Sequence, residues 1–449
     1  MYPNIVFILI DGLRSDRCYG NDRSCKTPNI DSLIKNGIYF DQAISSADGT
    51  FLSINSIFNS LFPFVTGVRA KKIVLTKDSY LDIIKNTGYH IYGIIPKFTS
   101  LNPIIKLCEN ENPTFAPEPP NAEYLSDGLG KKIIDLLKSK KTQEPWFTLI
   151  HINDLHWPLT VPEKTNSDRY GNTNYDRSVS AIDPWIGKFL DQIDLNKTLV
   201  ILTSDHGNLI PVDEKGIDVF EPEFQLGLNL GKKLLPKFSH NISKKPIISL
   251  KKFVRDVRLN KANRNMTSYE KRSRLPYFTM SLYDEIIKIP LVFAGHGVKK
   301  PQLISKMVRA VDIFPTISSI IKLPKMIMSV HGKSLIPLFE NKEYVEYGAY
   351  LHTIPYEKPS ESDKVGLRTS KFKYFRHSRD STKDIHLFDL ENDPFENNNI
   401  AQNNPSIVND MEKKISDIIK NTIPVEIKEE VSEEDTKRIE EELKKMGYL

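Results

Sequence analysis

The 449-residue sequence predicts an α/β fold: a large, mostly parallel central sheet with helices on both faces, plus a small C-terminal antiparallel sheet and helix. Three observations favour this class. Short apolar runs rich in β-branched residues alternate with segments of helical pattern. Polar residues follow several of these runs directly. From about residue 335, short aromatic segments replace the alternation.

The first apolar run, Asn4–Ile10, is typical of a central parallel strand that is buried on both faces. Residues 27–37 predict a helix, with Thr27 as N-cap, Pro28 at the first helical position and Gly37 at the stop. The alternation then continues along the chain. We expect helices over 51–61, 79–87, 128–138, 178–191 and 314–321, and strands over 90–95, 146–152, 198–203 and 290–294.

The change of pattern near residue 335 predicts two units. Residues 1–335 form the main α/β domain, with an insertion at about 208–280. Residues 336–449 form a C-terminal subdomain. Its predicted parts are strands at 347–351, 372–375 and 386–388 and a Glu- and Lys-rich terminal helix at 429–445.

The composition, 39% hydrophobic and 27% charged, excludes collagen-like and wholly disordered chains. Three cysteines without a C-x-x-C pair provide neither a disulfide framework nor a zinc motif. The apolar run near the start is far shorter than the roughly 18 residues that span a membrane. It also lacks a basic flank and a cleavage site, so we expect no signal peptide, no transmembrane segment and a cytoplasmic protein.

The insertion is strongly basic. Between Lys232 and Arg274 there are 14 Lys or Arg and two acidic residues, a net charge of +12, which leaves about −7 for the rest of the chain. Such a block attracts polyanions such as nucleic acid, acidic glycans or anionic head groups. A solvated surface loop is the simpler interpretation.

Two acidic residues end predicted buried strands, Asp11 and Asp205, and His206 follows the second. Buried carboxylates are unfavourable unless they are paired or bind a metal. Ligands in open α/β sheets bind at the carboxyl ends of the strands, where all three residues are expected. Two carboxylates and an imidazole suit a divalent first-row metal such as Mn, Zn or Fe.

Thr50 begins a predicted helix directly after Asp48 and Gly49. The free amides and the positive dipole at a helix N-terminus favour an anionic group. A threonine hydroxyl is a poor nucleophile unless a metal or a base lowers its pKa. A cation held by Asp11, Asp205 and His206 would do this. The alternative is that Thr50 is simply a helix cap.

Motifs in one order along the chain add a resemblance to a known family. They are Asn4–Gly12, Thr27–Asp31 with Gly37 and Phe40, Thr198–Gly207, Ile289–Leu291, Val311–Thr316, His331–Leu335, Leu387–Pro394 with Glu396 and Asn399, and Leu443–Leu449. In these motifs the sequence resembles the sulfatase family of the alkaline phosphatase superfamily. The resemblance covers nearly the whole chain apart from the basic insertion, and implies that 1–335 is the catalytic domain.

The departures from the family pattern concern the reaction. Sulfatases carry a Cys or Ser in a C/S-x-P-S-R motif that is matured to formylglycine, whereas this chain has Thr50-Phe51-Leu52-Ser53-Ile54. Formylglycine cannot form from Thr50. Gly12 stands where sulfatases usually have a second Asp, and His206 where many have Asn. This change favours one divalent transition metal, Mn, Zn or Fe, over Ca.

A Thr nucleophile beside one such metal resembles the phosphoethanolamine and phosphoglycerol transferases, and phosphonate monoester hydrolases share the Asp, Asp, His metal set. The resemblance implies metal ligation by Asp11, Thr50, Asp205 and His206. It implies in-line attack of Thr50 on the phosphorus of a phosphate ester, with a diester expected. A phospho-threonine intermediate would then pass its group to water or to an acceptor hydroxyl.

The resemblance implies roles for five further residues. His156 would act on the leaving group, Arg14 would grip a substrate oxygen, and Lys97 lies within one residue of a family lysine. Asp154 and His331 would contact substrate. A buried, hydrogen-bonded imidazole at 156 and a surface charge at 14 are the simpler interpretations. His151, in the same segment, is expected to be structural.

Three functions therefore stay open. The first is a metal-dependent hydrolase or phosphotransferase of phosphate esters that acts through Thr50. The second is a sulfuric ester hydrolase without formylglycine. The third is a non-catalytic family member that binds polyanions through residues 232–274. The expected partner of either enzyme is an anionic ester, while the organic part of the substrate and the oligomeric state are not predicted.

Overall fold

A computed structural model describes most of the chain: residues 2–21, 23–66, 73–77, 79–118, 121–139, 143–212, 257, 260–261, 263–275, 279–323, 330–353, 361–425, 434, 437–439 and 441–442. The charged stretch 232–274 lies largely outside these residues. Of the predicted terminal helix at 429–445, the described residues are 434, 437–439 and 441–442. In the described part of the chain, no helix is long and apolar enough to cross a membrane.

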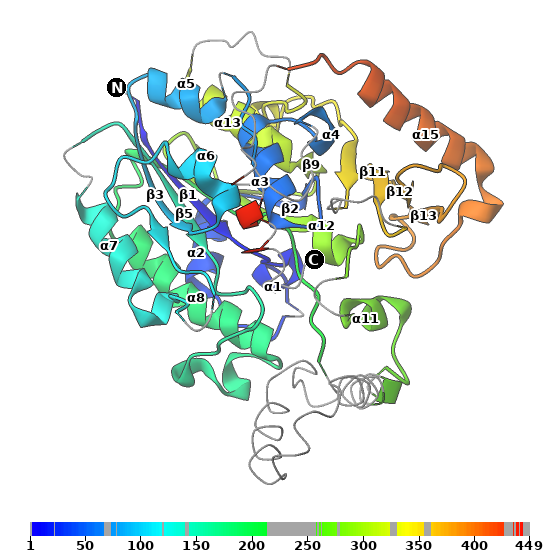
Figure 1. The fold of residues 1–449 in the computed structure, drawn as a ribbon, viewed down its shortest axis with the longest axis horizontal. Coiled ribbons are helices and arrows are strands. Elements are labelled where there is room, and N and C mark those ends of the chain that lie inside the picture. The colour runs from blue at the N-terminus through cyan, green and yellow to red at the C-terminus, as the bar shows by residue number, and fades with distance from the viewer. Residues whose placement is uncertain are drawn as a thin grey trace.

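A nine-stranded mixed sheet forms the centre of the molecule (Figure 1). Its order is β4-β3-β5-β1-β6-β7-β2-β8, with β9 paired to β2. The strands are β1 Asn4–Ile10, β2 Ile38–Ile44, β3 His90–Pro96, β4 Thr114–Phe115, β5 Trp146–Ile152, β6 Thr198–Thr203, β7 Lys288–Gly295, β8 Gln302–Ile304 and β9 Val308–Arg309. The central strands are continuous apolar runs because helices bury both of their faces.

Helices cover both faces of this sheet, as the sequence predicts. On one face, alternate β1 residues such as Phe7 pack against Phe58 and Phe314. On the other face, Val6 and Ile8 belong to a second core with Ile30, Ile133 and Ile186. The helices of the first face are α3 Thr50–Asn59, α5 Tyr80–Asn86 and α13 Ile313–Ile320, and those of the second are α2 Pro28–Asn36, α7 Leu129–Ser139 and α8 Asn174–Leu190.

Short helices lie along the chain between these elements. They are α1 Ser15–Cys18, α4 Pro63–Thr66, α6 Asn102–Ile105, α11 Ser268–Ser273, α12 Asp284–Ile287 and α14 Ile336–Phe339. The sequence did not predict β2, and it did not predict that β7 runs antiparallel to both β6 and β2. β2 follows Gly37 with no turn residues between, and Asp41 and Gln42 lie where its register shifts, so its pattern is neither alternating nor continuously apolar.

A small antiparallel sheet follows, as the sequence predicts, in the order β10-β11-β12-β13, and its strand β11 was not predicted. Its strands are β10 Ala349–His352, β11 Lys364–Arg368, β12 Phe372–His377 and β13 His386–Asp389. A helix, α15 Pro405–Lys420, packs on it through Met411 and Ile415. α15 precedes the predicted terminal helix at 429–445, whose described residues, 434, 437–439 and 441–442, are helical. The boundary at residue 335 stays a prediction.

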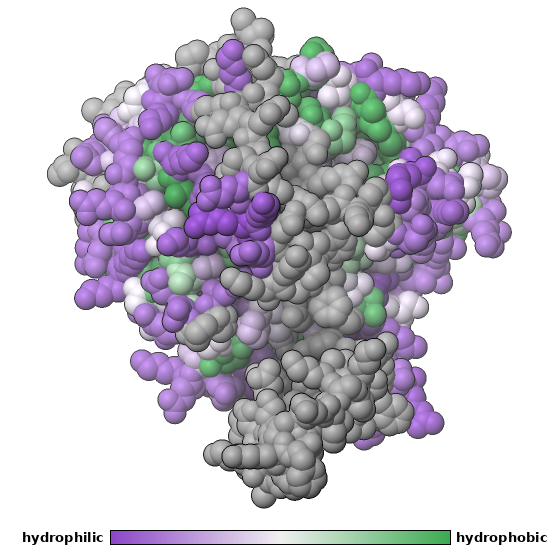
Figure 2. Space-filling view, in the orientation of Figure 1, coloured by the Kyte–Doolittle hydropathy of each residue, from purple (hydrophilic) through white to green (hydrophobic). Residues whose placement is uncertain are grey.

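The chain returns to the central sheet after α15. Ile439 is fully buried in the core on the α3 side of the sheet. The carboxylate of Glu442 accepts hydrogen bonds from the Thr99 backbone N–H and hydroxyl, at 3.0 and 2.6 Å. Figure 1 shows this segment in red beside α3 and α6, away from α15. Hydrophilic side chains dominate the coloured part of this face of the molecule, with small hydrophobic patches between them (Figure 2).

Candidate active site

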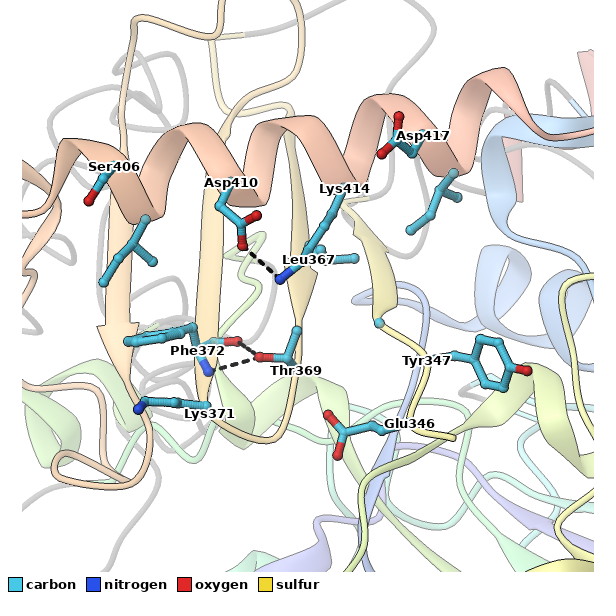
Figure 3. Close-up of a pocket in the computed structure, with 13 residues that line it drawn as sticks. Glu346, Tyr347, Leu367, Thr369, Lys371, Phe372, Ser406, Asp410, Lys414 and Asp417 are labelled. Atoms are coloured by element: carbon cyan, nitrogen blue, oxygen red, sulfur yellow. Dashed lines mark hydrogen bonds and ion pairs between the residues drawn. The ribbon is translucent and has the colours of Figure 1, made fainter. Parts of the chain in front are cut away.

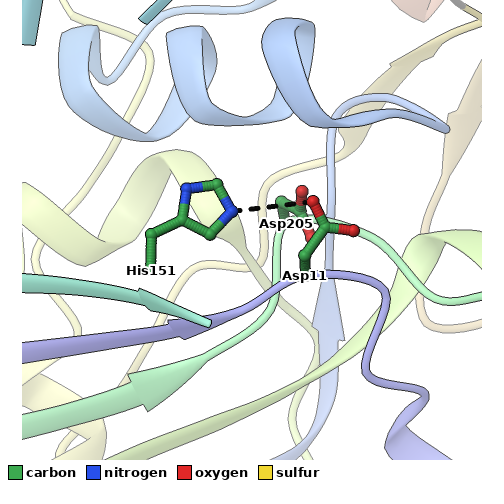
Figure 4. A group of neighbouring side chains, drawn as sticks. All are labelled: Asp11, His151 and Asp205. Atoms are coloured by element: carbon green, nitrogen blue, oxygen red, sulfur yellow. Dashed lines mark ion pairs between the residues drawn. The ribbon is translucent and has the colours of Figure 1, made fainter. Parts of the chain in front are cut away.

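Three adjacent strands, β5, β1 and β6, bring the candidate residues together at one edge of the sheet (Figure 4). Asp11 follows β1 directly, Asp205 lies two residues after β6, and His151 is the second-last residue of β5. All three side chains are buried, with exposed fractions of 3%, 0% and 2%. Because parallel strands end at the same edge, three sequence-distant residues form one cluster.

The polar atoms of this cluster converge on a small volume. Nε2 of His151 lies 3.6 Å from Asp11 Oδ2. Nε2 of His206 lies 3.9 Å from Asp11 Oδ1 and 3.6 Å from Asp205 Oδ2. One ligand atom from each of Asp11, His151 and Asp205 lies within 4.8 Å of the other two. This spacing suits groups that surround a common cation.

Hydrogen bonds from the backbone fix Asp205 in place. Its Oδ1 accepts from the N–H groups of Gly12 and His206, at 3.1 and 2.9 Å. The Ser204 hydroxyl donates to the Ile10 carbonyl at 2.7 Å and accepts from Leu13 N–H at 2.9 Å, which joins the ends of β1 and β6. Oδ2 of Asp205 has no hydrogen-bond partner in the described structure. The carboxylate is therefore held by one oxygen and offers the other.

The His206 ring is oriented by its own loop. Nδ1 lies 2.6 Å from the Gly207 carbonyl, so this nitrogen carries the proton and Nε2 presents its lone pair. The loop packs tightly: Gly207 N–H donates to the Ile286 carbonyl at 2.5 Å, and a Cβ at 207 would lie 2.2 Å from the Glu285 carbonyl oxygen. The His206 side chain points into the site, and residue 207 is a glycine because its backbone packs closely against Glu285 and Ile286.

Thr50 is the first residue of α3, and its hydroxyl faces the cluster. Oγ1 lies 3.1 Å from Asp11 Oδ2 and 3.2 Å from His206 Nε2. The N-cap is Gly49, with extended backbone and no side-chain cap, so Thr50 is not the helix cap. Ser53, one turn later, is held by the Ala47 carbonyl and by the Ser45 hydroxyl, at 3.1 and 3.0 Å. The N-terminus of α3 is thereby fixed beside the two carboxylates.

The charges in the cluster are unbalanced. Burial raises the pKa of Asp205, and the nearby Asp11 charge raises it further. Burial would also raise the pKa of Asp11, but the imidazoles of His151, His206 and His156 hold it below its usual value. Burial lowers the pKa of His206, while Asp205 and Asp11 raise it to a net value above normal. Two buried carboxylates in contact favour a bound positive charge.

The donor set fits a divalent metal ion. Asp11, Asp205 and His206 supply oxygen and imidazole ligands, and the His151 Nε2 and Asp205 Oδ2 atoms are buried without hydrogen-bond partners in the described residues. Buried polar atoms without partners are rare and indicate a missing ligand or a stored strain. Carboxylate with imidazole suits Zn, Mn or Fe.

The loop after β5 places the remaining predicted residues near this edge. His156 is half-buried, and it is one of the imidazoles that lower the pKa of Asp11. Asp154 accepts a hydrogen bond from Leu125 N–H at 3.1 Å through Oδ1. Burial raises the pKa of Asp154 to about 7. These two side chains leave the same loop from positions two residues apart.

Arg14 is buried rather than a surface charge, with 2% of the side chain exposed. Its guanidinium donates to both carboxylate oxygens of Asp16, at 2.8 and 2.9 Å, to the Asn208 carbonyl at 3.2 Å and to the Tyr269 hydroxyl at 2.8 Å. These contacts tie the loop after β1 to the start of the insertion and to α11. In this structure the guanidinium positions loops, and the predicted grip on substrate stays a prediction.

Lys97 and His331 do not join the cluster through any contact described. Lys97 is exposed just beyond β3, and its backbone N–H donates to the Phe115 carbonyl. His331 Nδ1 accepts from Phe62 N–H at 3.1 Å, and Nε2 pairs with the Thr422 hydroxyl at 2.8 Å. Burial, with the charges of Arg309 and Lys333, lowers the pKa of His331 to about 4. Its neutral ring joins the main domain to the residues after α15.

His151, expected to be structural, is the cluster member that sequence reasoning missed. The period of the strand contained the signal, because Phe147, Leu149 and His151 share the face covered by α3, where Phe147 packs on Phe7. A histidine in register with that apolar row is directed towards the N-terminus of α3. The sequence did not indicate His151 as a site residue because His151 lies inside the strand rather than after it.

A separate pocket lies in the C-terminal subdomain, between α15 and the small sheet (Figure 3). Its volume is about 780 Å³, and its lining includes Leu367, Phe372 and Ile407. Asp410 and Lys414 on α15 are paired at 2.7 Å. No residue of the candidate active site lines this pocket.

The fold and the cluster together define an α/β protein with a nine-stranded mixed sheet and a candidate metal site at the carboxyl edge of that sheet. A sequence model described as "Sulfatase" matches residues 3–323, more than half of the chain, so the chain belongs to the sulfatase family. A second model, described as "N-sulphoglucosamine sulphohydrolase, C-terminal", matches residues 277–421.

Curated relatives match parts of the chain. Arylsulfatase K of Gallus gallus is 30% identical over 156 residues, which cover 32% of this chain and 28% of the relative. The ulvan-active sulfatase of Formosa agariphila is 24% identical over 276 residues, 47% of this chain and 52% of the relative. The matched region thus spans about a quarter to a half of the length of these relatives.

Solved structures share the fold over nearly the whole chain. The Agrobacterium radiobacter phosphonate monoester hydrolase has a TM-score of 0.64 at 15% identity and covers 94% of this chain and 96% of its own. A Bacteroides thetaiotaomicron protein described as "4S-sulf", from work on glycosaminoglycan metabolism, has a TM-score of 0.64 at 18% identity, with coverage of 94% and 96%. At these identities the likeness concerns the fold.

Proposed function

We propose that this sulfatase-family hydrolase cleaves a phosphate ester, with a diester as the expected form, through covalent attack by Thr50 with one divalent cation. The observation that carries the proposal is the position of Thr50 Oγ1, within 3.2 Å of both Asp11 Oδ2 and His206 Nε2. A hydroxyl at a helix N-terminus, beside buried carboxylates and a lone pair on imidazole that can hold a cation, has an anion-binding site in front of it.

The residues of the site have separate roles in the proposed reaction. Asp11, Asp205 and His206 would hold the cation, which supplies charge neutralisation and a lower pKa for a nearby hydroxyl when bound. Thr50 Oγ1 forms a bond to phosphorus as the bond to the leaving oxygen breaks, and the Thr50 proton is released to solvent water, because the lowered pKa of Asp11 makes that carboxylate a poor acceptor. His156, one of the imidazoles that lower the pKa of Asp11, provides a proton to the leaving oxygen. Water or an acceptor hydroxyl then attacks phosphorus and releases Thr50.

The chemistry of the threonine side chain favours attack on phosphorus over attack on sulfur. The Cβ of Thr50 carries one oxygen, so a covalent Thr50 ester has no second hydroxyl on the same carbon that could expel the bound group. Its release requires a second in-line attack at the central atom, for which phosphate esters on a protein hydroxyl offer a well-known route. Attack by an alcohol in place of water would make the protein a transferase.

Hydrolysis of a sulfate ester is the second candidate function. The family match and the names of the relatives, arylsulfatase K and ulvan-active sulfatase, favour it. The same cluster would hold a sulfate group, since sulfate and phosphate are both tetrahedral oxyanions. In this case Thr50 would attack sulfur without maturation to formylglycine. A third candidate, a non-catalytic polyanion-binding protein, predicts no turnover of either ester.

The test compares turnover of an aryl phosphate monoester, an aryl phosphate diester and an aryl sulfate by the full chain loaded with Mn or Zn. We expect phosphate turnover to dominate and Thr50→Ala to remove it by at least ~1,000-fold, because one member of a catalytic unit carries most of its effect. Dominant sulfate turnover would overturn the phosphate assignment in favour of the second candidate. An inactive wild type that still binds polyanions would favour the third.

Thr50→Ser is the matched control, because it retains the hydroxyl and loses only a methyl group. We expect Thr50→Ser to keep measurable activity and to accumulate label on residue 50 when the protein is quenched during turnover of a radiolabelled phosphate ester. Near-normal activity of Thr50→Ala would contradict the proposal and would move the nucleophile to another group in the site.

A further inference from the structure

We propose that His151 is a direct ligand of the cation and that its imidazole, with that of His206, makes the site select a transition metal over calcium. This inference rests on the proposed function for the presence of a cation and assigns a residue that the family motifs do not supply. The juxtaposition that carries it is His151 Nε2, Asp11 and Asp205 in one buried group (Figure 4).

His151 Nε2 faces Asp11 in the buried cluster but makes no hydrogen bond to any described residue. Its side chain is 1% exposed, and Nε2 has no hydrogen-bond partner among the described residues. The nearest acceptor, Asp11 Oδ2, lies 3.6 Å away, which is too long for a hydrogen bond. A buried, unpaired imidazole nitrogen is unfavourable unless it meets another partner. A metal ion placed between Nε2 and the carboxylate would satisfy both atoms.

Asp205 also presents to the cluster an oxygen without a hydrogen bond in the described structure. Oδ1 is used by two backbone N–H groups, whereas Oδ2 is buried and has no hydrogen-bond partner in the described part of the chain. Ligand atoms of Asp11, His151 and Asp205 lie within 4.8 Å of one another, and the buried Asp205 Oδ2 and His151 Nε2 atoms, which can each offer a lone pair, make no hydrogen bond among the described residues. One cation would occupy both.

The ligand set favours a transition metal over calcium. With His206 included, the available ligands are two carboxylates and two imidazoles, and His206 Nε2 lies 3.6 Å from Asp205 Oδ2. Calcium takes six to eight oxygen ligands, and a backbone with Gly12 at φ +67° supplies no carboxylate at that position. Imidazole ligands suit Zn, Mn, Fe or Co instead. His151 thus strengthens the preference that His206 begins.

The test is metal binding, measured without turnover. Wild type and His151→Gln are loaded with zinc and with cobalt, and the dissociation constants are determined by competition with a chelator. We expect one bound ion per chain in the wild type, and a zinc dissociation constant at least ~10-fold higher in His151→Gln, since loss of even an outer partner of a metal site weakens binding by that much. The visible spectrum of bound cobalt should change as well. Calcium should bind more weakly than zinc.

His90→Gln is the matched control. His90 begins β3, two strands from β1, its side chain is 45% exposed, and its Nδ1 contacts Glu109 at 2.7 Å. We expect this variant to bind zinc as the wild type does. Equal zinc affinity and equal cobalt spectra of wild type and His151→Gln would overturn the inference, and so would tighter binding of calcium than of zinc.

A measurement on the wild type keeps the inference testable if His151→Gln does not fold. X-ray absorption of the zinc-loaded protein counts imidazole ligands: two imidazoles support the inference, and one overturns it. The two proposals fail separately, because a protein that binds zinc through two imidazoles and cleaves no ester refutes only the proposed function. A one-imidazole site with full Thr50-dependent turnover refutes only the role of His151.

Discussion

Asp154 is a half-buried residue whose carboxylate lies in an environment that opposes its charge. Oδ1 accepts one backbone hydrogen bond, Oδ2 has no hydrogen-bond partner among the described residues, and burial raises the pKa to about 7. Between the ordinary Asp pKa of 3.8 and a pKa of about 7, the folded protein keeps a proton that the unfolded chain has released. The free energy of unfolding therefore falls as pH rises through this window and stays at its lower value above it.

Asp154→Asn removes this penalty and keeps the acceptor for Leu125 N–H. We expect the variant to be more stable than wild type at pH 8, by on the order of a few kcal/mol. At pH 5 we expect a smaller gain in stability. Chemical denaturation at both pH values measures the difference. A gain that does not depend on pH would contradict the assignment. A raised KM in the stabilised variant would support the predicted contact of Asp154 with substrate.

The sequence predicted those site residues whose position in space is determined by their position at the end of a strand. Asp11 and Asp205 follow buried strands, and adjacent pairing of β1 with β6 brings them together. His331 follows the motif order of the family, but its two ring nitrogens contact Phe62 and Thr422, a contact between segments 91 residues apart or more. Such tertiary partners leave no local signal in a sequence.

A buried ionic cluster joins the C-terminal subdomain to the loop of His206. Lys373 on β12 is fully buried, and its Nζ lies 2.5 Å from Asp284 and 2.6 Å from Glu396. Arg272 on α11 pairs with Glu285 on α12 at 2.5 Å. α12 in turn accepts the Gly207 N–H through the Ile286 carbonyl. The position of the candidate site thus depends on charges supplied by both units.

Lys373→Met tests this element. The change removes the nearest cation of the buried Glu396 and leaves Asp284 paired with Arg368 at 3.1 Å, and we expect the free energy of unfolding to fall by about 3–5 kcal/mol. Lys371→Met is the control two residues away, because Lys371 is 53% exposed and its pair with Glu391 is 3.5 Å long. A surface pair of this kind contributes about 0–1 kcal/mol. Equal effects of the two variants on urea unfolding would refute a role for the buried cluster.

Elements with a strong local pattern were predicted closely, and those defined by pairing were not. β1, β5 and β6 have the predicted bounds because helices bury both of their faces, which makes them continuous apolar runs. β8 and β9 are only three and two residues long and exist because β2 provides a partner. A strand this short carries too few residues for a period to be recognised.

At the scale of the whole molecule, the last described segment stabilises the edge of the sheet that holds the candidate site. Ile439 is buried in the core beside α3, and Glu442 binds Thr99, which follows β3 at the same edge. Phe98 meets Phe51 edge-on at 6.1 Å between ring centroids, and Phe51 is the residue after Thr50. Packing therefore connects residues near 440 with the N-terminus of α3 over a sequence separation of almost 400 residues.

Ile439→Ala is expected to lower the free energy of unfolding by about 2–5 kcal/mol, because it leaves a cavity in a core that has no exposed side for relaxation. The variant should also increase the rate of hydrogen exchange more at Thr99–Leu101 than at α15, since the lost packing lies at the edge of the main sheet. Ile423→Ala is the control in the same part of the chain, because Ile423 is 60% exposed and its removal should change stability by less than ~0.5 kcal/mol. If Ile439→Ala and Ile423→Ala were equally stable, the segment would only rest on the surface, and the connection between the end of the described chain and the helix of Thr50 would have to be abandoned.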